Sequence, residues 1–322
     1  MSKLISYIKN PFRLYWKLEK YISFDWMSDK AFVKMKYRAA MDKKLNLKDP
    51  TTFNEKLQWL KLYDHNPLYT TLVDKMAVKE YVADKIGEEY IIPTLGVWEN
   101  FDDIDFDTLP DQFVLKCTHD SGGLVIVTDK SKLDREAAKK KIENALAANF
   151  YKKGREWPYK NVPPRIIAEQ FMIDDVSREL KDYKFFSFNG EPKYLFIASD
   201  RNRVGQEVKF DYFDIDFNRL PLRQAAHPNS TYPIQRPQKY EEMVRLASQL
   251  SKGIPQVRID MYEVNGQVYF GEYTFFHHGG MVPFIPEQYD YIWGEQIVLP
   301  SNTKTRETRG DHSEKSTRSR RK

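Results

Sequence analysis

The chain has 322 residues, 41% of them hydrophobic and 14% aromatic, so it is long and apolar enough to form two or more packed units. No apolar run approaches the roughly 18 residues of a membrane-spanning helix, and the N-terminus lacks a long apolar stretch with a small-residue cleavage site. We therefore expect a cytoplasmic protein. The single cysteine, Cys117, excludes a disulfide framework and a cysteine-rich zinc site, and its apolar neighbours predict a small buried residue.

The net charge of +5 is unevenly distributed along the chain. Residues 1–48 hold 12 Lys or Arg against 4 Asp or Glu, and residues 301–322 hold 8 against 3. The remaining residues 49–300 hold 31 basic and 39 acidic side chains, a net charge of −8. Two basic ends on an acidic body argue against nucleic acid as the partner of the fold.

The first 22 residues alternate apolar and basic side chains, with Pro11 interrupting the run. Such a segment can lie as an interfacial helix on the anionic inner face of the membrane, or its apolar stripe can pack on its own domain. Both interpretations are open from sequence.

Residues 1–92 form a region of helical pattern. One helix is expected to begin after Thr51-Thr52, with apolar residues recurring at helical spacing from Phe53 onward. A second helical pattern runs from Asp74-Lys75 onward, and Lys75 is either a ligand-binding or a solvated lysine.

Residues 113–117 and 123–128 read as two strands joined by a small polar loop. Lys116 ends the first strand, and Ser121, Gly122 and Gly123 form the loop. A lysine beside glycine-rich backbone can bind phosphate, although an ordinary turn has the same composition. The Walker A spacing is absent.

The rest of the chain has a mixed pattern that predicts an α+β fold. Further strands are expected at 165–171, 183–188, 192–198, 207–213, 256–263 and 267–275, with helices near 132–149 and 238–252. We expect a small lobe over about 93–164 and a large lobe over about 165–300. The tail 301–322 has no aromatic or aliphatic side chain and is expected to be disordered.

The pair of strands at 256–263 and 267–275 carries Arg258, Asp260 and Glu272 among apolar neighbours. Buried carboxylates need a cation, which is either an oxygen-ligated metal or simply the arginine. With a two-residue loop at Asn265-Gly266 the two carboxylates would lie on opposite faces. For a shared metal the loop must contain an odd number of residues or a bulge must shift the register. We expect a three-residue or bulged turn around Asn265-Gly266, with Asp260 opposite Phe270.

The order of these parts resembles the ATP-grasp superfamily. The segments Phe53-Asn-Glu-Lys-Leu-Gln58, Asp74-Lys75, Lys116-Cys-Thr-His-Asp-Ser-Gly-Gly123 and Gly271-Glu-Tyr-Thr-Phe275 are similar to its TupA-like branch, named for teichuronopeptide biosynthesis. The resemblance covers about residues 50–300 and implies an ATP-grasp fold, in which ATP lies between two α+β lobes.

The resemblance also implies roles for individual residues. Lys75 and Lys116 would contact the phosphates, Ser121, Gly122 and Gly123 would cover them, Glu169, Gln170 and Phe171 would flank the adenine, and Asp182 would hold the ribose. Asp260 and Glu272 would bind Mg2+, with Thr274 where many relatives have Asn, and Lys184 and Arg258 would act on the transferring phosphoryl group. His277 and His278 would either line the acceptor site or be plain turn residues.

The chemistry implied is that of a carboxylate–amine ligase, in which ATP and Mg2+ activate a carboxylate as an acyl phosphate and an amine then attacks it. In the TupA-like setting the acid would be a carboxylate-bearing saccharide or small acid of a surface polysaccharide or its precursor. A sugar transferase or kinase of the same pathway, using the same nucleotide site, is the alternative. A non-enzymatic binding protein held by its basic ends is the third class.

Overall fold

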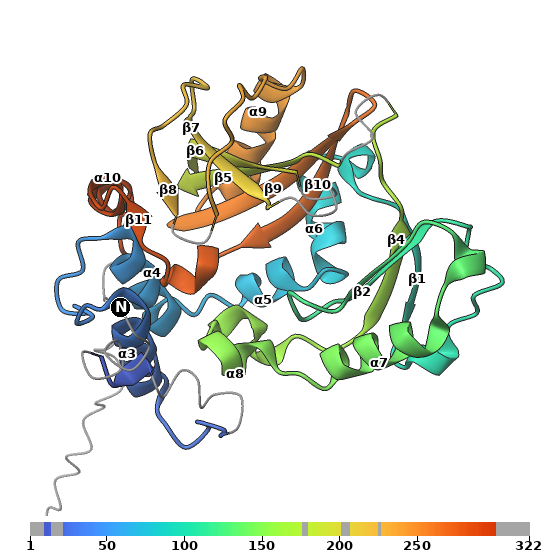
Figure 1. Ribbon diagram of the computed structural model, residues 1–322, viewed down its shortest axis with the longest axis horizontal. Helices are drawn as coiled ribbons and strands as arrows, with labels where there is room; N and C mark the ends of the chain where they lie inside the picture. The colour runs from blue at the N-terminus through green and yellow to red at the C-terminus, as the bar shows by residue number, and fades with distance from the viewer. Residues whose placement is uncertain (1–9, 14–21, 176–179, 201–206, 225–226, 301–322) are drawn as a thin grey trace, which may run out of the picture.

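The computed structural model describes residues 10–13, 22–175, 180–200, 207–224 and 227–300, which form two antiparallel sheets with helices around them (Figure 1). The four-stranded small sheet has the order β1-β4-β2-β3, with β1 at Thr94–Trp98, β2 at Phe113–Cys117, β3 at Leu124–Val127 and β4 at Ile166–Gln170. The five-stranded large sheet has the order β10-β9-β5-β6-β7, with β5 at Asp182–Phe188, β6 at Glu191–Ser199, β7 at Lys209–Asp214, β9 at Gln256–Val264 and β10 at Gln267–Thr274. A short pair joins β8 (Arg223–Gln224) to β11 (Phe284–Ile285). The predicted α+β class is confirmed.

The helices lie beside and between the sheets (Figure 1). They are α3 (Asp29–Met41), α4 (Phe53–Tyr63), α5 (Leu68–Val73), α6 (Ala77–Ile86), α7 (Arg135–Leu146), α8 (Phe150–Gly154), α9 (Tyr240–Ser251) and α10 (Gln288–Glu295), with short 3-10 turns η1 (Glu88–Tyr90), η2 (Phe101–Asp103), η3 (Lys130–Lys132), η4 (Trp157–Asn161) and η5 (His277–Gly280). Helices α5 and α6 run between the two sheets, α7 packs on the small sheet and α9 on the large one. Among the described residues, no helix combines the length and hydropathy needed to cross a bilayer.

The start of α4 follows the predicted signal. The Thr52 side chain accepts from the Glu55 N–H, and the Glu55 carboxylate accepts from the Thr52 N–H, which is a capping box. The second predicted helix is α6, which begins at Ala77, just after Asp74-Lys75. Asp74 lies between α5 and α6, where its side chain accepts from Met76 N at 2.9 Å and pairs with Arg165 at 2.6 Å.

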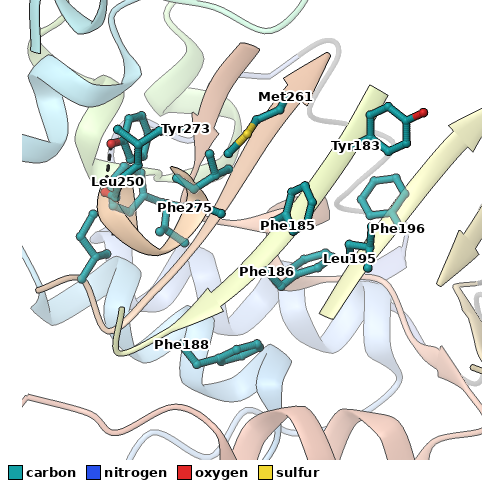
Figure 2. Packing of buried hydrophobic residues seen from close by; sticks show 14 of the residues in the cluster. Tyr183, Phe185, Phe186, Phe188, Leu195, Phe196, Leu250, Met261, Tyr273 and Phe275 are labelled. Atoms are coloured by element: carbon teal, nitrogen blue, oxygen red, sulfur yellow. Dashed lines mark hydrogen bonds between the residues drawn. The ribbon is translucent and has the colours of Figure 1, made fainter. Parts of the chain in front are cut away.

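The large sheet holds the main core because helices cover both of its faces. Every residue of β5 is buried, and its aromatic side chains alternate in direction. The ring centroid of Phe185 lies 5.9 Å from that of Tyr240 in α9, and the ring centroid of Phe186 lies 4.7 Å from that of Trp293 in α10. Figure 2 shows Phe185 and Phe186 near Phe196. In another part of the same core, the Tyr273 hydroxyl donates to the Leu250 carbonyl at 3.0 Å (Figure 2). The core fixes the strands that carry the acidic site residues.

A smaller core stabilises the small sheet. Phe113, Leu115 and Cys117 of β2 pack against Ala138 and Ile142 of α7. Cys117 is fully buried, as predicted. Strand β4 pairs with β1 and β2, so the small sheet extends to Gln170.

The β9–β10 hairpin differs from the predicted geometry. The turn has two residues, Asn265 and Gly266, with φ of 51° and 76°, and Val264 pairs with Gln267. The prediction of a three-residue or bulged turn was therefore wrong, as was the pairing of Asp260 with Phe270, because Phe270 pairs with Met261. The register shifts further along, at Gly271, and Asp260 pairs with Glu272.

The two ends of the chain are not part of this description. Most of the predicted amphipathic segment 1–22, namely residues 1–9 and 14–21, and the whole predicted tail 301–322 lie outside the described residues.

Candidate functional site

A pocket of about 250 Å³ opens between the two sheets. Its wall comes from five places: the α5–α6 segment, the residues after η1, β2 with the β2–β3 loop, β4 and the large sheet. It brings together the predicted residues Lys75, Lys116, Ser121, Gly122, Gly123, Glu169, Asp182, Lys184 and Glu272. Gln170, Phe171, Arg258, Asp260 and Thr274 do not line it.

The β4 side of the pocket is an ion cluster around Glu169. Its carboxylate lies 2.6 Å from Lys79 Nζ and 2.5 Å from Lys116 Nζ, and it is buried. Burial opposes the charge of Glu169, but the two lysines outweigh it and lower the pKa of the carboxyl group. Glu169, whose backbone was predicted to flank the adenine, thus uses its side chain to hold two cations at the pocket wall.

Lys79 is a site residue that the sequence did not reveal. It follows Lys75 by four residues, which places neighbouring side chains on one helical face, and this spacing was the available signal. Burial lowers the pKa of Lys79.

The backbone of Gln170 is bonded to the segment before β1 rather than left open to the pocket. The Gln170 N–H donates to the Pro93 carbonyl at 3.0 Å, and the Gln170 side chain is exposed. That N–H is therefore already used in this structure.

The glycine loop is held by Asp120. Lys75 Nζ donates to the Asp120 carbonyl, and the Gly123 N–H donates to the Asp120 carboxylate at 2.9 Å. A Cβ on Gly123 would lie 2.5 Å from Ala145 Cβ and 2.8 Å from Cys117 Sγ, so this glycine is required by packing. Lys75 is not a solvated lysine, because burial lowers its pKa.

The opposite wall carries a second ion cluster, centred on Asp260. Arg258 Nε and Nη2 donate to its two oxygens at 2.6 and 2.7 Å, and Lys184 Nζ also contacts it. Lys184 lies 2.6 Å from Asp182 as well. Asp260 has no exposed surface, and burial opposes its charge, but Arg258 and Lys184 prevail and lower its pKa.

The Gly271 bulge brings Glu272 to the same cluster. Arg258 Nη2 lies 3.5 Å from Glu272 Oε1 and 2.9 Å from Thr274 Oγ1, so all three side chains face the same side of the hairpin. A Cβ on Gly271 would lie 3.0 Å from the Asp260 carbonyl oxygen, a tight approach that favours glycine.

The two histidines of η5 behave differently. His277 is buried, and its Nδ1 lies 2.8 Å from Arg258 Nη1, whereas His278 stacks on Phe210 with 6.1 Å between ring centroids. Burial lowers the pKa of His277 well below its ordinary value and that of His278 to about 4. Burial thus favours the neutral form of both rings.

The donor set of the pocket fits a magnesium–nucleotide complex. Within the described ranges, no group of three or more His, Cys, Asp and Glu could hold a metal by itself. Mg2+ commonly takes one or two carboxylates, with phosphate and water completing its shell. Glu272, whose side chain is 42% exposed, is accessible for this, whereas Asp260 is already held by two cations.

The remaining wall is apolar and fits a purine base. It consists of Val78, Ile91, Ile92, Tyr262 and Phe270, while Lys75, Lys116 and Lys184 face the same space. An apolar wall with a few polar groups is the usual composition of a nucleotide-sized pocket.

The chain is only weakly similar to solved ligase structures. The D-alanine–D-alanine ligase of Helicobacter pylori is 14% identical with a TM-score of 0.40, over 76% of this chain and 69% of that one. The D-alanine–D-alanine ligase of Bacillus anthracis, solved with ATP, is 14% identical with a TM-score of 0.36, over 64% of this chain and 54% of that one. This chain thus spans about half the length of the latter. No curated protein matches.

The TupA-like ATP-grasp family matches residues 55–298, which is most of the chain and includes both walls of the pocket. The chain belongs to the TupA-like ATP-grasp family.

Proposed function

We propose that the protein is an ATP-dependent carboxylate–amine ligase that works through an acyl phosphate. The observation that carries this proposal is the pocket, in which an apolar wall and three lysines face Glu272 between two sheets. A base on the apolar wall and a phosphate chain along the lysines would satisfy both sets of groups.

Each wall has a distinct task in this reaction. Lys75 and Lys116 bind the phosphates from the small-sheet side, and Asp182 binds the ribose. Lys184 neutralises charge on the transferring phosphoryl group from the large-sheet side, and Arg258, which does not line the pocket but lies 3.5 Å from Glu272, adds positive charge from behind that wall. Positioning and electrostatics supply most of the catalysis in phosphoryl transfer.

Glu272 is the residue that would hold Mg2+, with Thr274 able to accept or donate through a bound water and Asp260 fixing the arginine beside them. Bound Mg2+ would screen the negative charge of the phosphates.

The substrates follow from the chemistry and the family. The acid is a carboxylate-bearing saccharide or small acid, and the amine is an amino acid or amino sugar, so that the product is an amide of a surface polysaccharide or its precursor. The basic head, residues 1–22, would keep the enzyme in the cytoplasm near an anionic inner membrane face.

Hydroxylamine trapping tests the proposal. The protein is incubated with ATP, Mg2+, hydroxylamine and a panel of sugar acids and amino acids. A ligase releases phosphate and forms a hydroxamate, because hydroxylamine captures the acyl phosphate. A stable phosphorylated sugar would instead establish a kinase, and neither product with any acid would refute an enzymatic role.

A further inference from the structure

Helix α4 carries two buried polar side chains that the pocket does not use. Gln58 and Lys61 are 0% and 1% exposed. Gln58 Nε2 donates to the carbonyls of Gly279 and Gly280 at 2.9 and 2.8 Å, and Lys61 Nζ donates to the Gly279 carbonyl at 2.8 Å. The two side chains also join each other at 3.0 Å.

These hydrogen bonds hold the η5 turn, in which three consecutive residues have positive φ. His278, Gly279 and Gly280 have φ of 50°, 64° and 65°. A turn of this kind leaves buried carbonyls that no helix or sheet satisfies, and such groups need partners. A Cβ on Gly280 would lie 2.4 Å from Gln58 Nε2, so the contact with α4 also requires this glycine.

The same turn delivers His277 to Arg258. Because an arginine only donates, the His277 Nδ1 at 2.8 Å must be an acceptor, and the ring proton therefore lies on Nε2. Nε2 donates to Gln224 Oε1 at 2.6 Å, an oxygen that also accepts from the Tyr212 hydroxyl at 2.8 Å. Both ring nitrogens are thus used, which fixes the tautomer and the orientation of the ring.

Two aromatic rings complete the support. His277 lies edge-on to Phe186, with ring centroids 5.0 Å apart, and 5.2 Å from Phe196. The imidazole therefore cannot rotate away from Arg258 without displacing core residues of β5 and β6.

We infer that His277 is the positioning residue for Arg258, and that α4 holds it in place through Gln58, Lys61 and the Gly279-Gly280 turn. Asp260 fixes one edge of the guanidinium by two hydrogen bonds, and His277 fixes the Nη1 corner. The role of Arg258 at the phosphoryl group rests on the proposed function. Helix α4 thereby contributes to catalysis without lining the pocket.

Two substitutions of His277 test this inference. His277→Leu removes the acceptor, and we expect kcat for ATP turnover to fall about 10- to 100-fold, the usual loss when an orienting partner is removed. The Kd for a magnesium complex of AMPPNP, measured by calorimetry, should stay within about twofold of the wild-type value, because nucleotide binding relies on other residues. His277→Asn retains an oxygen acceptor near Nδ1 and should recover most of kcat.

A matched pair on α4 tests the remote support. Lys61→Met should lower kcat in the same direction, because the turn loses one of its donors. Lys56→Met is the control: it makes the same change on the same helix, where Nζ bonds the Ile297 carbonyl at 2.9 Å, away from η5. Thermal melting of each variant checks that it is folded.

The outcomes separate the two claims. Wild-type kcat in a folded His277→Leu protein, or equal losses of AMPPNP affinity and kcat, would overturn the positioning role. Absence of ATP turnover and of hydroxamate in the wild-type protein would overturn the proposed function instead.

Discussion

The two walls of the pocket use the same elements in different ways. Each places one buried carboxylate between two cations: Glu169 between Lys79 and Lys116 on the small-sheet side, and Asp260 between Lys184 and Arg258 on the large-sheet side. Lys116 remains 24% exposed, whereas Asp260 is completely enclosed.

The difference separates adjustable cations from fixed ones. A lysine is a point charge on a flexible stem, so Lys116 can leave Glu169 for an incoming phosphate at little cost. Arg258 is planar, is held along one edge by its two hydrogen bonds to Asp260, and has further partners in Thr274 and His277. We interpret the small-sheet wall as the binding side and the large-sheet wall as the rigid catalytic side.

Asp260→Asn should have the largest effect on stability. It leaves Arg258 and Lys184 buried without their common anion, and breaking a buried pair in this way costs about 3–5 kcal/mol. Urea unfolding measures the change. Glu191→Gln, which removes the exposed partner of Lys193, is the control and should leave the midpoint unchanged. An equally small effect of Asp260→Asn would show that the large-sheet wall is not rigidly paired.

Glu169→Gln should lower the free energy of unfolding by less than Asp260→Asn does, about 2 kcal/mol, because the amide oxygen still accepts a hydrogen bond from one lysine. The effect should depend on pH. The folded-state pKa of Glu169 is lowered, so its contribution is present above the ordinary pKa of glutamate and is lost as pH falls through the folded value. The difference in unfolding free energy between wild type and variant should therefore shrink below about pH 4.5. A difference that persisted at lower pH would contradict the ion cluster.

The two loop glycines should respond unequally to alanine. Gly123→Ala places a Cβ against Ala145 and Cys117 and should destabilise the fold by about 1 kcal/mol or more. Gly122→Ala meets only the Asp120 carboxylate, at 3.8 Å, and should be close to neutral. Equal melting temperatures of the two variants would refute the packing role of Gly123.

Most strands could be predicted from sequence because their patterns are local. The expected strands at 183–188, 192–198 and 256–263 match β5, β6 and β9 to within about a residue at each end. Strand β1 was missed, since Gly96 interrupts a short run that pairs with β4, far along the chain.

Site residues within a sequence motif could be predicted, whereas those brought to the site only by packing could not. Lys79 and Asp120 act only because α6 and the glycine loop meet β4 and α7. The shift in hairpin register was expected at the turn, yet it lies at Gly271. A glycine inside a strand pattern often signals a bulge, so the cue was present. The contact between His277 and Arg258 depends on α4 and could not be derived from spacing.

Calorimetric titration with a magnesium complex of AMPPNP tests the central claim most directly. We predict a single binding site in the wild-type protein. Lys116→Ala removes a cation that contacts the phosphates and should weaken binding at least tenfold, which is about 1.4 kcal/mol or more. Lys132→Ala is the control and should bind as the wild type does, because the Lys132 side chain on η3 is 81% exposed. No binding to the wild-type protein, or equal affinities of the two variants, would contradict a nucleotide site between the sheets.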